Sequence, residues 1–305
     1  MILVSVLGAI GIIYIMIVQM SADAMFAAEY YQRIEFREKA YYMSRSAYTG
    51  VMNLFTLDDP TVDSFRDDWA QALPPYHLED EQVYISVKVE DLERYFNPNY
   101  IIEDDDIEEK HYNQFRRLLE VLLIEPDIAN PIADWIDADH QRRNPMGADG
   151  LDYREIPVKG APLDSVAEIK LIKGITPEIF QGQEIEGKKY KGLRDVLTVY
   201  SNGYVNVNTA DQEVLMSLDD QVTDSMAGEI IRRRDEEPFS SMDDLLKLPG
   251  MNHDLLFRMK QVADVKSEYF KITITVENYL KETSDLNVIV KRSGQTGKVI
   301  LWQAD

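Results

Sequence analysis

The sequence contains no cysteine, few histidines and far fewer basic than acidic residues. The missing cysteines exclude disulfides, thiolate nucleophiles and Cys-based zinc or iron–sulfur sites. The four histidines are widely spaced and give no pattern typical of a His-rich metal site or a His-based catalytic centre. Lys and Arg total 32 against 54 Asp and Glu, a formal charge of −22. So acidic a surface repels nucleic acid phosphates and argues against a nucleic-acid partner.

Familiar catalytic motifs are also missing. The sequence has no phosphate-binding loop, no G-x-S-x-G, no H-E-x-x-H and no G-x-G-x-x-G. The composition itself is ordinary for a globular protein, with 45% hydrophobic and 28% charged residues. A length of 305 residues suggests about two domains.

The N-terminal segment 1–22 carries no charge and is long enough to cross a bilayer as a helix. A secretory signal peptide would have a basic start and a small-residue cleavage site, and neither is present. Residues 23–49 contain no Pro or Gly and continue the helical pattern until Asp58-Asp59-Pro60. We therefore expect one helix over 1–60. A simple membrane anchor would explain only its front half, so the unbroken continuation favours a filament-forming helix.

Alternating apolar residues predict strands at both ends of the remaining chain. Residues 82–89 alternate, as do 270–276, and 288–290 and 299–302 predict two further strands around a turn at 293–297. Between them, helical patterns run from about 91 to 264, with start signals at Thr209, Thr223 and Ser241. Because a lone strand is unstable, the strand before the helices must pair with those after them. We predict an α+β fold, in which a sheet domain (61–92 and 265–305) receives an inserted all-α domain (93–264).

An acidic stretch around Asp134-Trp135-Ile136-Asp137-Ala138-Asp139 points to a possible calcium site, because calcium prefers carboxylate oxygens. It is not an EF-hand: with Asp137 as the first ligand, Arg142 stands where the turn glycine belongs and Ala148 replaces the bidentate Glu. A different loop site and a solvated loop of capping aspartates both remain open. A second acidic run, 103–109, is typical of a solvated turn at a helix start.

Residues 205–260 are similar to a helix-hairpin-helix module, but their charge does not suit DNA. The segment has twelve acidic and six basic residues, and Arg232-Arg233-Arg234 is followed at once by three acids. We expect a helical packing unit or a protein-binding surface, in which Asn206, Asn208 and Thr209 serve as turn and cap residues.

Several segments together resemble the K-class minor pseudopilins of the type II secretion system. Besides the apolar first helix, they are VEDLERYFNPNY, FRRLLEVLL, ADWIDADHQRRNPMGADGLDY, APLDSVAEIKLIKG and YVNVNTADQEVL, in this order. The resemblance covers nearly the whole chain. It implies a pilin-like long helix and antiparallel sheet with a large inserted α-domain, in agreement with the organisation predicted above.

The resemblance also implies a location, partners and a metal. The protein would be a non-enzymatic subunit at the tip of a periplasmic pseudopilus, anchored in the bacterial inner membrane before assembly. Its partners would be the I-class and J-class minor pseudopilins, with which it initiates assembly, together with other pseudopilins. It would hold structural calcium in the α-domain. The residues of this chain that correspond are Asp137, Asp139, Asp149 and Asp152, although Gly150 departs from a position that is often acidic.

Position 5 is informative if Met1 is the first residue of the mature chain. Most pilins carry Glu there, which neutralises the N-terminal amine of a neighbour; this chain has Ser5. A carboxylate in an apolar bundle is costly unless paired, so Ser5 suits a subunit with nothing above it. The register would differ if Met1 were only a start codon. The alternative hypothesis is a membrane-anchored periplasmic enzyme or ligand-binding protein that uses an acidic cleft.

Overall fold

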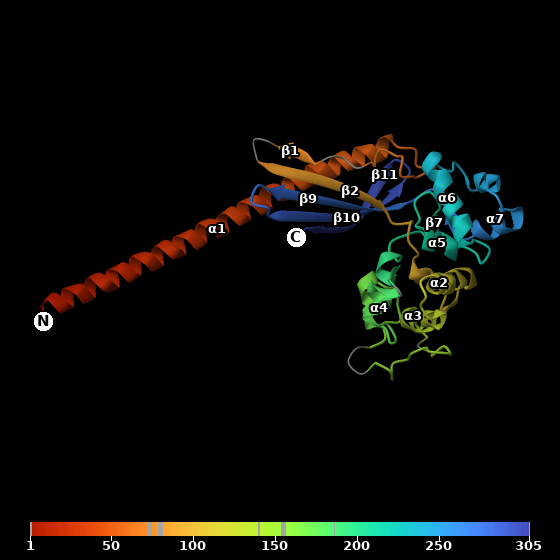
Figure 1. The fold of residues 1–305 in the computed structure, drawn as a ribbon, viewed down its shortest axis with the longest axis horizontal. Coiled ribbons are helices and arrows are strands. Elements are labelled where there is room, and N and C mark those ends of the chain that lie inside the picture. The colour runs from red at the N-terminus through yellow and green to blue at the C-terminus, as the bar shows by residue number, and fades with distance from the viewer. Residues whose placement is uncertain are drawn as a thin grey trace.

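A computed structural model of the chain describes residues 2–71, 75–78, 82–139, 141–153, 157–185 and 187–304. Met1, where the predicted first helix starts, lies outside the described residues. The fold consists of a long helix, a five-stranded sheet packed on its second half, and a mostly helical insertion at the far end of the sheet (Figure 1).

The first helix, α1, runs without a break over Ile2–Leu57. At 1.5 Å per residue it is about 84 Å long. Its described side chains are exposed as far as Glu35 apart from the half-buried Ala22, whereas Ala40, Ser44, Val51 and Phe55 are buried on one face. The front half therefore extends from the molecule as an isolated rod (Figure 1), and the predicted long helix is confirmed.

The sheet is antiparallel throughout, in the order β1-β2-β9-β10-β11. These strands are β1 (Tyr76–Leu78), β2 (Val83–Asp91), β9 (Tyr269–Asn278), β10 (Thr283–Ser293) and β11 (Thr296–Ala304). β2 pairs with β9, with Ile85 opposite Val276 and Val87 opposite Ile274, which confirms the expected pairing across the insertion. The core between sheet and helix contains Phe55, Trp69 and Phe270, with ring centroids 4.7–6.4 Å apart.

Residues 92–268 lie between β2 and β9 and form a second core of their own. The helices there are α2 (Glu109–Val121), α3 (Ala129–Ile136), α4 (Pro177–Gln181), α5 (Gln212–Ser217), α6 (Asp224–Glu236) and α7 (His253–Met259). Short 3₁₀ helices separate them: η1 (Pro98–Ile101), η2 (Pro126–Ile128), η3 (Val166–Leu171), η4 (Leu193–Asp195) and η5 (Met242–Lys247). The predicted α+β pilin-like class with a helical insertion is thus confirmed.

Two details of the insertion differ from prediction. It is not purely α-helical, because its described residues form three two-stranded ribbons: β3–β4 (Ile102–Glu103 and Asp106–Ile107), β5–β6 (Gly182–Ile185 and Lys188–Lys191) and β7–β8 (Val205–Asn206 and Ala263–Asp264). Thr223 and Ser241 cap α6 and η5 as expected, but α5 is preceded by Asp211 rather than Thr209. The Thr209 hydroxyl does not cap α5 because it donates to Asp91 instead.

Candidate functional site

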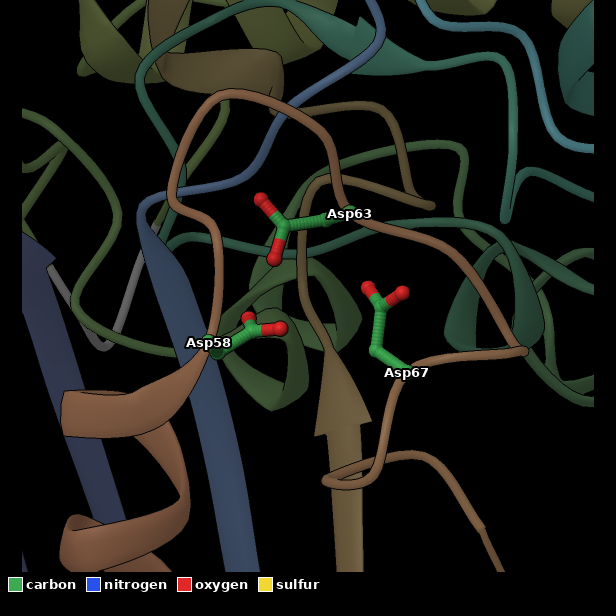
Figure 2. Close-up of side chains that lie close together, drawn as sticks. All are labelled: Asp58, Asp63 and Asp67. Carbon is green, nitrogen blue, oxygen red and sulfur yellow. The ribbon is translucent and has the colours of Figure 1, made fainter.

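The loop that follows α1 carries three carboxylates that face one another: Asp58, Asp63 and Asp67 (Figure 2). Each offers an oxygen within 4.8 Å of the others. The guanidinium of Arg292, from the end of β10, lies among them, with Nη1 2.8 Å from Asp58 and Nη2 2.5 Å from both oxygens of Asp63. The same guanidinium lies over the ring of Phe270, 4.9 Å from its centroid. The charge that three acids would otherwise leave in the interior is therefore partly neutralised from within the chain.

This cluster continues into the insertion through Asp91, at the end of β2. One oxygen of Asp91 accepts hydrogen bonds from Thr209 Oγ1 at 2.5 Å, Ser267 Oγ at 2.8 Å and Asn206 Nδ2 at 3.1 Å. Asn206 also donates to the Asp63 carbonyl at 3.0 Å. The VNVNTA segment thus binds the sheet domain through its side chains. The acidic joint is the name used below for the acids Asp58, Asp63, Asp67, Asp91 and Glu93 together with their partners Arg292, Asn206, Thr209 and Ser267.

Glu93 is fully buried and completes the acidic joint. Its carboxylate accepts from the backbone N–H groups of Tyr269 at 2.9 Å and Asn202 at 3.3 Å, one from each domain. Burial raises the pKa of Glu93 well above its usual value, and the neighbouring Asp91 adds to the shift. Burial also raises the pKa of Asp91, and raises that of Asp63 to about 7 although Arg292 opposes it. The joint thus attaches the insertion to the sheet through hydrogen bonds from both domains.

The predicted ligands Asp137 and Asp139 lie just after α3. Asp137 is fully buried; one of its oxygens lies 2.5 Å from Arg143 Nη2 and the other accepts from the Asp139 N–H at 3.0 Å. Arg143 also bonds Asp134, at 2.9 Å. Asp139 accepts from the Gln141 N–H at 2.7 Å. The nearest positive charge to Asp137 is thus a guanidinium of its own loop.

The other two predicted ligands, Asp149 and Asp152, occupy the following turn. Asp149 accepts from the Leu151 N–H at 2.8 Å and donates its own N–H to Asp152 at 3.1 Å. Asp152 forms ion pairs with Arg142 and, at 2.6 Å, with Lys173. These contacts lower the pKa of Asp152, led by the hydrogen bond from Lys173.

The donor chemistry of these four side chains fits calcium, since all are carboxylates. Their placement differs from that of a closed site: in the described part of the chain, no three of the four have ligand atoms within 4.8 Å of one another. Arg142, Arg143 and Lys173 neutralise two of them instead. The sequence pattern placed the aspartates in one loop but did not indicate which cations would lie beside them.

The three consecutive arginines of the helix-hairpin-helix-like segment all have partners within the chain. Arg232 pairs with Glu229 and Glu236 at 2.5 Å, and Arg233 pairs with Glu237 at 3.0 Å. Arg234 is buried and donates to the carbonyls of Val207 and Ala210. Each of these three arginines is thus committed to a partner within the chain.

The exposed half of α1 is a further candidate site. Among the described residues, α1 is the one helix long and apolar enough to cross a membrane. Its side chains there include Ile10, Ile13 and Ile17, each more than half exposed. Apolar surface of this extent requires lipid or protein around it.

Comparisons with known proteins agree with this architecture. Two family models, both described as type II secretion system (T2SS), protein K, match residues 94–184 and 205–265, together about half of the chain. The chain is 29% identical over 195 residues to the type II secretion system protein K of Pseudomonas aeruginosa; the match covers 61% of this chain and 55% of that protein.

A solved structure has the same fold. A chain in the crystal structure of the GspK-GspI-GspJ complex from the enterotoxigenic Escherichia coli type 2 secretion system superimposes with a TM-score of 0.72. The alignment covers 90% of this chain and 98% of that one at 18% sequence identity.

Replacing Arg292 tests the acidic joint. In Arg292→Met the buried Asp63 loses its cation, so we expect the free energy of unfolding to fall by about 3–5 kcal/mol in urea titrations. The neighbouring Lys291→Met removes an equal charge from a partly exposed pair with Glu268 and is expected to cost less than about 1 kcal/mol. Equal losses in the two variants would contradict the role given to Arg292.

Stability should also depend on pH through the joint. At pH values between the ordinary and the raised pKa values of Asp63, Asp91 and Glu93, the folded chain holds protons on these groups that the unfolded chain has lost. The free energy of unfolding therefore rises as the pH falls through this range. From about pH 8 to about pH 6 we expect the free energy of unfolding to increase by on the order of 1 kcal/mol for each group that becomes protonated. Urea titrations at both values measure it. Asp63→Asn should reduce the gain, whereas the exposed Asp59→Asn should not; a chain more stable at pH 8 would refute the assignment.

Proposed function

The chain belongs to the protein K family of the type II secretion system, and from this we propose that it is a minor pseudopilin at the tip of the secretion pseudopilus. The observation that carries the proposal is the pilin-like arrangement itself: one long helix, apolar and exposed in its first half and packed on an antiparallel sheet in its second. The role proposed is structural rather than enzymatic, because the buried carboxylates of the acidic joint are held by donors of the chain itself.

The exposed helix accounts for both anchoring and assembly. Before assembly, residues 1–22 would cross the bacterial inner membrane and leave the folded part in the periplasm. In the filament, the same surface would pack against the helices of neighbouring subunits. Both environments cover apolar surface that the isolated chain leaves open to water.

The position of the insertion supports a place at the end of the filament. Residues 92–268 lie at the end of the sheet farthest from the N-terminus of α1 (Figure 1). A further subunit stacked beyond this end would have to fit around the insertion. A terminal subunit meets no such obstacle and could start the filament to which others are added below.

The proposed partners are the I-class and J-class minor pseudopilins. The E. coli chain with the same fold is part of the crystallised GspK-GspI-GspJ complex. We extend that association to this chain because α1 and the sheet domain, the parts that a pilin assembly uses, are present.

Calcium is proposed for the loop that contains Asp137, Asp139, Asp149 and Asp152. Their carboxylate chemistry supports it, and a bound ion would supply a charge that now comes from arginine and lysine side chains. In this proposal calcium competes with Arg142 and Arg143 for the same oxygens, so its effect on stability is smaller than it would be if no cation were there.

Assembly is tested with the complete chain in detergent. Mixed with full-length I-class and J-class pseudopilins of the same organism, it should elute as a 1:1:1 complex in size-exclusion chromatography with light scattering. Exchange of residues 1–22 for an unrelated membrane helix should abolish secretion in a deletion strain, because an anchor alone does not form the filament bundle. Three separate peaks, or full secretion with the exchanged helix, would refute the pseudopilin role.

Calcium binding is tested by thermal melting of the same protein. Millimolar calcium should raise the melting temperature above that in chelator, and Asp139→Asn with Asp149→Asn should remove the increase. The matched control Asp104→Asn with Asp105→Asn removes two charges from the other acidic run and should keep it. Identical melting temperatures for the wild type in calcium and in chelator would rule out the site.

A further inference from the structure

The two edges of the sheet differ in how they are protected. β1 is only three residues long, whereas β11 forms the other edge with nine residues and, among the described residues, pairs with β10 alone. An antiparallel edge strand presents unpaired N–H and C=O groups that can bind another strand. Natural edges are usually kept short or carry charges and prolines, but β11 has a single charge, Lys298, and no proline.

The outer strand also exposes apolar side chains. Val299, Ile300 and Leu301 are 39%, 41% and 37% exposed, while the β10 residues opposite Val299 and Leu301, which are Val290 and Ile289, are buried. Leu301 lies opposite Ile289 and Val299 opposite Val290, so Ile300 is an extra residue without a partner on β10. This bulge divides the strand and leaves Leu301–Ala304 as a regularly paired segment next to the exposed Ile300.

A cleft adjoins this segment on the side of the insertion. It has a volume of about 490 Å³ and lies between the face of the sheet and the 3₁₀ helices η3 and η4. Leu301 and Gln303, alternate residues of β11, line it together with Ile289, Lys271 and Arg194. A strand added to β11 would point alternate side chains into the cleft, as in other cases of recognition by strand addition.

The charge of the hairpin indicates what kind of strand fits. Residues 286–304 contain three cations. Arg292 is buried against Asp58 and Asp63, and Lys291 pairs with Glu268, so the exposed cation of this edge is Lys298, although the whole chain has a net charge of −22. A second copy would bring its own Lys298 against this one, and two strongly acidic bodies would repel each other. An acidic strand from a different protein complements the edge in charge as well as in backbone geometry.

We propose that the edge of β11 binds an extended, acidic strand of a partner pseudopilin. The strand pairs along Leu301–Ala304, covers Ile300 and inserts alternate side chains into the cleft below the insertion. This inference rests on the proposed pseudopilin function and adds to it the surface through which the folded domains meet.

The test compares variants in binding to the full-length I-class and J-class pseudopilins in detergent. Ile300→Lys places a charge on the apolar edge and Lys298→Glu reverses its one cation, and each should weaken binding at least about tenfold. Tyr279→Lys alters a more exposed large side chain, at 67%, in the turn between β9 and β10 and should bind like the wild type. In hydrogen exchange, the Leu301–Ala304 amides should become protected in the wild-type complex.

Three results would overturn the proposal. If the wild type binds but Ile300→Lys and Lys298→Glu bind equally well, β11 is not the contact and the pseudopilin function stands. If the wild type binds neither partner, the function and the surface fail together. If the chain alone forms a dimer that Ile300→Lys abolishes, the occupant is a second copy. Circular dichroism of each variant establishes that it is folded.

Discussion

One guanidinium holds three parts of this protein together. Arg292 comes from the sheet, its acidic partners Asp58 and Asp63 follow α1, and its contact with the Ser267 carbonyl reaches the return from the insertion. Because it is only about 3% exposed, its ion pairs act in a medium that screens charge poorly, and loss of either side leaves an uncompensated charge. The orientation of α1 relative to the insertion depends on this contact.

The rest of the acidic joint is built from directional donors rather than from cations. Asp91 and Glu93 accept from hydroxyl, amide and backbone groups of both domains, so each bond restrains an angle as well as a distance. A flexible linker would let the insertion swing relative to the sheet. A joint with buried carboxylates satisfied in this way restrains it, which suits the proposed end-of-filament role because the outer surface is then presented in one direction.

Periodicity was sufficient to predict the long helix, the four long strands and the helical insertion, because each of these features is encoded in a local pattern. It could not predict the acidic joint, whose partners are far apart: Asp63 and Arg292 are 229 positions apart, and Asp91 and Ser267 are 176 apart. Asp91 ends a strand with an alternating pattern, and VNVNTA is a distinctive motif. Neither pattern indicates which residues Asp91 or the motif will contact. Thr209 illustrates the limit: its position in the sequence predicts a helix cap, but its hydroxyl donates to Asp91 instead.

For the candidate calcium loop, the sequence predicts that several acids lie in one loop, but it does not predict how their carboxylates are arranged. Asp137, Asp139, Asp149 and Asp152 do occupy one loop, but their nearest partners depend on how Arg142 and Arg143 turn within it. The edge of β11 was likewise foreseeable only as a strand. Its position at the border of the sheet follows from the order of pairing, which brings β2 rather than β11 next to β9.

The insertion between two adjacent strands also sets the order of events during synthesis. β1 and β2 leave the ribosome early, yet β9, the neighbour of β2, is made only after all of residues 92–268. During this interval β2 has an open edge, which is the kind of surface that pairs wrongly with other chains. The folded insertion helps β2 and β9 to find each other, because it brings its own two ends together. At this point the Leu92 N–H donates to the Tyr269 carbonyl at 2.9 Å. The insertion, proposed above to lie at the end of the filament, is thereby also the part that closes the sheet in the nascent chain.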